Sequence, residues 1–241
     1  MKKIFTSVFF IVVALFTFAQ KEEPIPQESV SHEQWESLLK LYVNVPGNVN
    51  YEGFKRDKDK LESYVSYLKS MPIQDEWTDD AKKAYWLNIY NAYVVKIVVD
   101  NYPVKSINDI KNAFGQKVIL IGEKDIYSLN DVEDMLRKMK DPRVHFGMTK
   151  AAMSSPKLSN IAFTYENVDK RLEALAINFL NTPNKNMIST EEVKLNEIFK
   201  TYAKDFPSKG ALIDFLNKYA RAEIDAKAKI SYLEFNWNLN K

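Results

Sequence analysis

Apolar residues recur at helical spacing along most of the chain, and most strongly between Ala81 and Tyr102. The apolar face of this segment comprises Tyr85, Trp86, Ile89, Tyr93, Val94, Ile97 and Val98. Thr78 precedes the segment as a hydroxyl cap, and acidic residues fill its first turn. An apolar face this broad predicts a buried helix around which the rest of the chain packs.

Shorter helical patterns precede and follow this helix. They cover residues 35–42, 61–68, 107–114, 128–139, 165–180, 191–206 and 211–220. A proline, a glycine or an asparagine ends most of these segments, as expected at helix termini. The chain therefore predicts six to eight helices in a single domain.

Extended segments are few and short. Lys117–Ile121 and Ile126–Tyr127 flank a turn and predict a small hairpin. Polar and apolar residues alternate in Arg143–Met148, which predicts a third strand with Arg143 and His145 on one face. Ile230–Leu239 is expected to fold back as a final extended piece. The predicted class is α+β, predominantly α-helical, with a small sheet packed on a helical body.

The N-terminus has the pattern of an export signal. Lys2 and Lys3 precede an apolar run from Ile4 to Phe18, and Ala19 ends a segment that resembles a cleavage site. We therefore expect a signal peptide at 1–19, a disordered linker at 20–31 and a folded domain at 32–241. The mature protein would be periplasmic or secreted, without a stable membrane span; an uncleaved anchor is the alternative.

Charge and cysteine content exclude several classes of function. Of the 34 Lys and Arg residues, Lys2 and Lys3 leave with the signal, so basic and acidic residues balance at 32 each. A neutral chain lacks the basic footprint of a nucleic-acid-binding protein. With no cysteine and only two histidines, the chain has no disulfide, no thiol nucleophile and little to hold a metal. We expect no metal and no cofactor.

The polar chemistry gathers in the stretch from Asp141 to Ser159. Arg143 and His145 are followed by Ser154 and Ser155, and Glu133 precedes them on a predicted helix. In one interpretation, Ser155 or Ser154 is a nucleophile, His145 is its base, and Glu133 or an asparagine orients that base. In a second, Arg143, His145 and the helix amides bind an anionic or polar ligand without turnover. In a third, the stretch is structural: Arg143 pairs with Asp141 or Glu133, His145 hydrogen-bonds the core, and the serines cap the next segment.

Further candidate ligand-binding residues lie on neighbouring helices. They are Trp86, Asn88, Tyr90, Asn91 and Arg137, together with Ser154. Asn88 and Asn91 are three positions apart, so their amides point the same way on a helix. These amides would either satisfy buried backbone groups or orient a ligand.

Several ordered blocks resemble a bacterial family known as domain of unknown function 547 (DUF547). The blocks are AYWLNIYNAYVVKIVVDNYPVKSI, SLNDVEDMLR, DPRVHFGM followed by SSPKL, NVDKRLEALAINFLN and the terminal NWNLN. The resemblance spans Trp35 to Asn240. It implies no settled activity for the chain.

The resemblance extends to individual site positions. Glu133, Arg137, Arg143, His145 and Pro156 match the family pattern. Asp134 stands where a histidine is usual, and Lys150 and Ser155 stand where cysteines are usual. A cysteine beside a histidine would be the natural nucleophile and base, and this chain lacks the thiol.

These observations favour a non-catalytic ligand- or protein-binding domain with a polar pocket around Arg143 and His145. Asn88, Asn91 and Glu133 are expected to line this pocket, and its partner would be an unidentified small molecule or protein. The alternative is a serine-dependent hydrolase or acyltransferase that uses Ser155 and His145.

Overall fold

The computed structural model describes residues 30–241, apart from the side chain of Lys209. The predicted signal peptide and nearly all of the predicted linker lie outside these residues. Within 30–241, no helix is both long and apolar enough to cross a bilayer.

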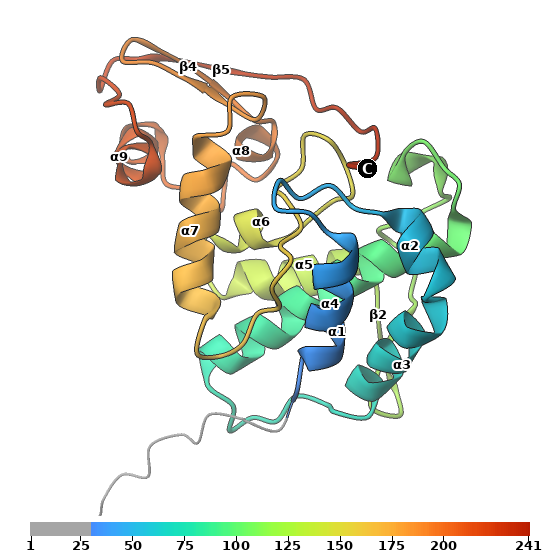
Figure 1. Cartoon of the computed structure of the whole chain (residues 1–241). Helices are drawn as coiled ribbons and strands as arrows, with labels where there is room; N and C mark the ends of the chain where they lie inside the picture. The colour runs from blue at the N-terminus through green and yellow to red at the C-terminus, as the bar shows by residue number, and fades with distance from the viewer. Residues whose placement is uncertain (1–29) are drawn as a thin grey trace, which may run out of the picture.

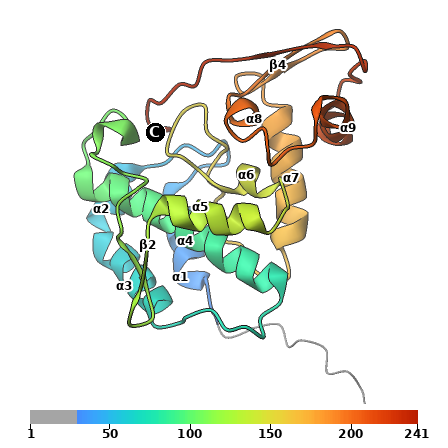
Figure 2. The same cartoon turned by 180° about the vertical axis from the view of Figure 1, so that it is seen from behind.

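The predicted central helix is confirmed as α4 (Asp79–Asn101), and the hydroxyl of Thr78 accepts a hydrogen bond from the backbone N–H of Ala81 at its N-terminus. Helices pack against several sides of α4, with α5 lying across it (Figure 1, Figure 2). These helices are α2 (Tyr51–Arg56), α3 (Lys58–Lys69), α5 (Leu129–Lys138) and α7 (Val168–Leu180). Most of α4 is therefore buried, as its broad apolar face requires.

The N-terminal helices form one side of this core. Helix α1 (Glu33–Tyr42) packs on α2 and α3, and the indole of Trp35 stacks on Tyr64 with ring centroids 5.8 Å apart. The sequence patterns did not predict α2, which is a short helix capped by Asn50. Gly53 permits the close packing of α2 on α1, because a Cβ there would lie 2.4 Å from the ring of Tyr42.

The predicted hairpin and the helix after it are confirmed. Strand β1 (Ile119–Ile121) pairs antiparallel with β2 (Asp125–Tyr127). Ser128 and Asp131 then form a reciprocal capping box at the N-terminus of α5. A short 3₁₀ helix, η1 (Ile107–Asp109), lies before the hairpin where a short helix was expected.

The predicted strand at Arg143–Met148 is wrong, because these residues form the single helical turn α6 (Val144–Gly147). Asp141 and Pro142 begin the turn: their carbonyls accept hydrogen bonds from the N–H groups of Val144 and His145. Proline is well suited to the start of a helix, since its fixed φ is helical. Arg143 and His145 consequently do not share one face of a strand.

The C-terminal part differs most from the predicted elements. The predicted helix at 191–206 is strand β4 (Glu192–Leu195) followed by the short helix α8 (Ile198–Thr201). β4 lies between β3 (Met187–Ile188), which is antiparallel to it, and β5 (Lys229–Tyr232), which is parallel to it. Helix α9 (Lys209–Tyr219) is confirmed.

The last residues return to the helical body, as predicted. The N–H of Leu239 donates to the carbonyl of Lys105, and the carbonyl of Asn240 accepts from Val49. The hydroxyl of Tyr51 donates to the side chain of Asn240 over 2.8 Å. The predicted α+β class with predominantly helical content is therefore confirmed, and the C-terminal segment is positioned to line sites formed by α5 and α8.

Candidate functional site

His145 lies in α6 with its ring buried, 4% of the residue being exposed. Its Nε2 is 2.8 Å from Oδ2 of Asp205, which lies in the turn between α8 and α9. The ring packs on Tyr202 and Phe206, with centroid separations of 4.4 and 5.4 Å. Burial lowers the pKa of His145, and the hydrogen bond to Asp205 only partly opposes this effect.

Asp205 joins His145 to Arg137. The guanidinium of Arg137 holds both oxygens of Asp205, with Nη2 at 3.1 Å from Oδ1 and Nε on Oδ2. Burial alone would raise the pKa of Asp205, but the bonds from Arg137 and His145 outweigh it and lower the pKa. The sequence patterns did not mark Asp205, because no local motif surrounds it.

A second polar cluster surrounds Glu133. Its Oε2 lies 2.6 Å from Nζ of Lys150, and the hydroxyl of Tyr90 lies within 3.4 Å of both groups. The hydroxyl of Tyr202 also bonds Glu133, so the Tyr202 ring stacks on His145 while its hydroxyl reaches Glu133. Burial would raise the pKa of Glu133, but Lys150 outweighs it and lowers the pKa.

Both candidate serines hold backbone groups. The hydroxyl of Ser155 accepts from the N–H of Lys150 over 2.7 Å and donates to the carbonyl of Pro156 over 3.0 Å. The hydroxyl of Ser154 accepts from the N–H of Asn236 over 2.9 Å. Within residues 30–241, neither hydroxyl hydrogen-bonds to His145. The predicted arrangement of Ser155, His145 and Glu133 as nucleophile, base and orienting acid is therefore not assembled.

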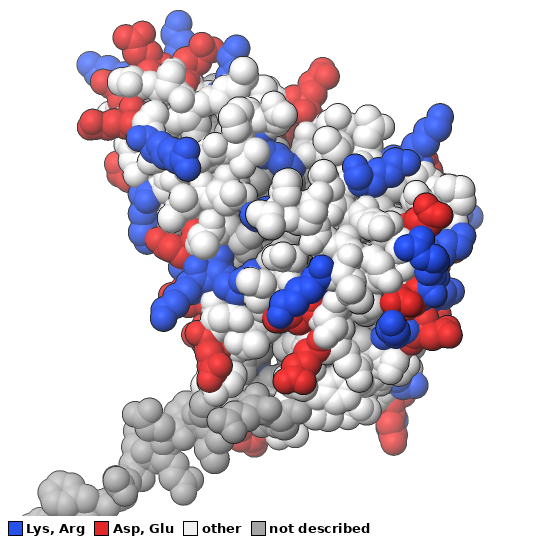
Figure 3. Space-filling view, viewed as in Figure 1, with Lys and Arg blue, Asp and Glu red and all other residues white. Residues whose placement is uncertain are grey.

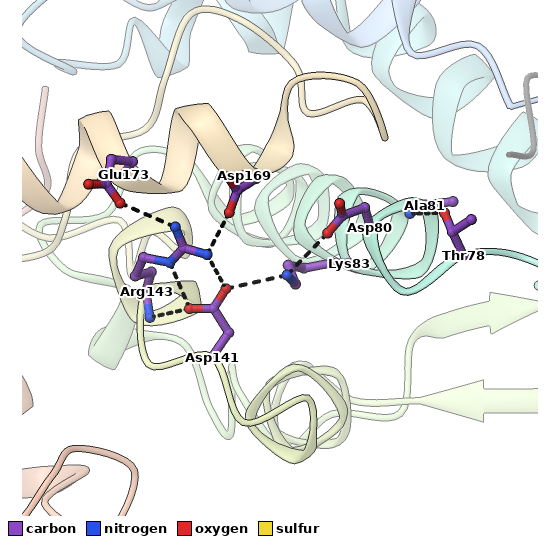
Figure 4. Close-up of polar contacts among 8 residues, drawn as sticks. All are labelled: Thr78, Asp80, Ala81, Lys83, Asp141, Arg143, Asp169 and Glu173. Carbon is purple, nitrogen blue, oxygen red and sulfur yellow. Dashed lines mark hydrogen bonds and ion pairs between the residues drawn. The ribbon is translucent and has the colours of Figure 1, made fainter.

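Arg143 is held by three carboxylates, as Figure 4 shows. Its Nε and Nη2 each lie 2.9 Å from an oxygen of Asp141, and α7 contributes Asp169 at 2.7 Å and Glu173 at 3.3 Å. Lys83 of α4 also reaches Asp141, over 3.3 Å. Arg143 therefore joins α6 to α7, and carboxylates occupy its fork.

The candidate residues of α4 are buried and fix backbone segments. Asn88 donates to the carbonyl of Phe163 over 2.7 Å and accepts from its N–H over 3.1 Å. Asn91 donates to the carbonyl of Gly147 and accepts from the N–H of Thr149. Each amide thus uses its oxygen and its nitrogen to hold the main chain beside α6.

The aromatic candidates of α4 pack within the core. The ring of Trp86 makes edge contacts with Tyr85 and Tyr127 at 5.5 Å. Tyr90 is fully buried; its hydroxyl reaches Glu133 and Lys150, and the Lys150 ammonium lies 5.9 Å from the centroid of its ring. Trp86 consequently supports the packing around the hairpin, while Tyr90 extends the cluster of Glu133 and Lys150.

A cavity of about 310 Å³ opens beside His145. Its lining consists of Arg137, Lys140, Asp141, Pro142, Val144, His145, Lys204 and Asp205. Within the described part of the chain, no cluster of three or more His, Asp or Glu side chains is placed to hold a metal ion. The cavity is therefore a polar site built from α5, α6 and the turn after α8.

Residues 74–180 match the family described as protein of unknown function, DUF547. This segment belongs to the DUF547 family. The comparisons with curated proteins and with solved structures found no match to the chain. The DUF547 segment contains Glu133, His145, Lys150 and both serines, whereas Tyr202 and Asp205 come from the chain beyond it. The partners of His145 thus lie outside the matched DUF547 segment.

Proposed function

We propose that this chain is a non-catalytic binding domain and that a small anion binds in the cavity beside His145. The bonding of the two candidate serine hydroxyls carries the non-catalytic part of the proposal. A serine hydroxyl requires an adjacent base to become a nucleophile. Here both hydroxyls hold backbone groups, and in the described part of the chain neither bonds His145.

The charges of the lining favour an anion. Asp205 is paired with Arg137, and Asp141 is paired with Arg143 and Lys83. Lys140 and Lys204 remain as exposed cations at the cavity. With Arg137 they give the lining three positive charges against the two carboxylates of Asp141 and Asp205, an excess of one.

The size of the cavity limits the ligand. A volume of 310 Å³ lies at the lower end of the range for small-molecule pockets. It suits an anion such as phosphate or a small carboxylic acid. On the face seen in Figure 3, basic and acidic side chains are interspersed, so the charge that favours an anion is local rather than spread over that face.

Calorimetric titration with inorganic phosphate tests the proposal. The double variant Lys140→Ala with Lys204→Ala should bind phosphate at least about tenfold more weakly than the wild type. The matched control is Lys138→Ala with Lys200→Ala, which removes the same charge from exposed positions of α5 and α8 that do not line the cavity. Absence of binding to the wild type, or an equal loss in both double variants, would overturn the proposal.

We also propose that the chain is exported, either to the periplasm or outside the cell. The basic start, the apolar run and the cleavage-like segment at Ala19 support this proposal. Mass spectrometry of the protein from its native host should find a mature N-terminus after Ala19. An intact N-terminus in the cytoplasmic fraction would contradict it.

A further inference from the structure

A second cavity, of about 260 Å³, is lined in part by Tyr202, whose ring also packs on His145. Segments distant in sequence supply its aromatic walls, which are Phe114, Tyr202, Phe235 and Trp237. The rings of Phe235 and Trp237 are 4.5 Å apart, and Phe114 meets Trp237 edge-on at 6.4 Å. Because Trp237 is partly exposed, this aromatic cluster presents ring surface to the cavity.

Lys150 provides a polar group in the lining of this cavity. Its side chain is 13% exposed, and it pairs with the 9% exposed side chain of Glu133. An ammonium carries three N–H donors, and the described acceptors of Lys150 are Glu133 and the hydroxyl of Tyr90. The third donor has no acceptor among the described residues, so it is left for a ligand. The ammonium also lies 5.3 Å from the ring centroids of both Phe114 and Tyr202, which line the same cavity.

The charges of the lining select against a charged ligand. Glu133 neutralises Lys150 directly, and Glu197 adds a carboxylate to the wall. An anion in the cavity would be repelled by the carboxylate of Glu197, and a cation would be repelled by the ammonium of Lys150. The arrangement is therefore best matched by a neutral ligand.

The polar lining also selects against a purely apolar ligand. Asn130, Lys150, Glu197 and Thr201 lie around the cavity. An apolar ligand would cover such groups without replacing their bonds to water, at a cost of about 1–3 kcal/mol for each group left unpaired. Hydroxyl groups both donate and accept, so they satisfy an amide, an ammonium and a carboxylate alike.

We propose that this cavity binds a neutral sugar ring. The C–H groups of such a ring pack on the negative faces of aromatic side chains, and its hydroxyls meet the polar lining. The cavity volume limits the site to about one ring. The site is separate from the anion cavity, because the two cavities share no lining residue.

Saturation-transfer NMR with methyl β-glucoside and N-acetylglucosamine tests the proposal, with glucuronate and glucosamine as the charged counterparts. The wild type should bind a neutral sugar in preference to both charged sugars. Trp237→Ala should weaken this binding at least about tenfold. The matched control is Tyr232→Ala, because Tyr232 is 42% exposed on β5 but lies outside the cavity lining.

Two further variants keep the test decisive if Trp237→Ala does not fold. Trp237→Phe retains an aromatic ring and should weaken sugar binding while the melting temperature stays near that of the wild type. Lys150→Met with Glu133→Gln removes the donor without leaving an unpaired buried carboxylate, and should also weaken binding.

Failure of both neutral sugars to bind the wild type, or equal affinity for a charged sugar, would overturn the proposal. Phosphate binding should be unaffected by the Trp237 variants, so the two proposals fail separately.

Discussion

His145 and Asp205 are 60 positions apart in sequence, yet Nε2 and Oδ2 lie 2.8 Å apart in the folded chain. Arg137 holds both oxygens of the same carboxylate. The imidazole lines a cavity together with Arg137, Lys140 and Lys204, and neither candidate serine hydroxyl bonds it in the described part of the chain. This arrangement supports the proposed anion site.

Breaking the buried pair formed by Glu133 and Lys150 should cost much more stability than removing both partners together. Lys150→Met leaves Glu133 buried without its partner, and removal of one partner of a buried ion pair costs about 3–5 kcal/mol. Urea unfolding should show this loss, and the double variant with Glu133→Gln should recover much of it. Lys194→Met is the control, because its pair with Glu192 is exposed and should be worth less than about 1 kcal/mol. Equal losses in the single and double variants would contradict the account.

Arg143 should act in stability rather than in ligand binding. Arg143→Ala removes bonds to Asp141, Asp169 and Glu173, and we expect a loss of about 1–3 kcal/mol in the free energy of unfolding. Phosphate affinity measured by calorimetry should stay within about twofold of the wild type. A stable variant that no longer binds phosphate would place Arg143 in the site after all.

His32 should make the folded chain sensitive to acid. Its ring is buried against Tyr64, and burial lowers its pKa from 6.5 to about 4. Between these values the unfolded chain takes up a proton that the folded chain does not, so the stabilisation from His32 is complete above pH 6.5 and is lost as pH falls through 4. The difference in unfolding free energy between the wild type and His32→Gln should shrink over this range. A difference independent of pH would exclude His32 as the cause.

The serines should be unreactive. A fluorophosphonate probe labels activated serine hydroxyls, and the hydroxyl of Ser155 is bonded to the backbone of Lys150 and Pro156. Labelling of the wild type should match that of Ser155→Ala, as measured by intact-protein mass spectrometry. Labelling that disappears in Ser155→Ala would restore the hydrolase alternative.

Much of the fold was predictable where one local signal dominates. Helix α4 has a wide apolar face and a capping threonine, and α5 has a complete capping box at Ser128. The strand predicted from the alternation at Arg143–Met148 was wrong, because an alternating pattern of only a few residues fits a strand and a helical turn equally well. In 191–206, a helical spacing beginning at Leu195 concealed the alternating burial of β4, which depends on pairing with β5.

The candidate site was predictable only in part. Its residues within the DUF547 segment could be chosen by type, but their partners could not. Asp205 and Tyr202 reach the site through long-range packing, and neither is marked by a local motif. Arg143 was placed in the pocket because its fork suits an anion. The structural alternative paired it with Asp141 or Glu133, and Asp141, only two positions away, does occupy the fork.

The most direct test of the central claim is NMR of the histidine side chains during a phosphate titration. The chain has two histidines, so His32 serves as an internal reference bonded to Tyr64 on a different part of the fold. The account predicts that the ring signals of His145 shift with saturation in the wild type, while those of His32 stay fixed. The shift should be lost at the same phosphate concentrations in the variant Lys140→Ala with Lys204→Ala. Signals of His145 that do not respond, or that respond equally in this variant, would contradict the assignment of the anion site.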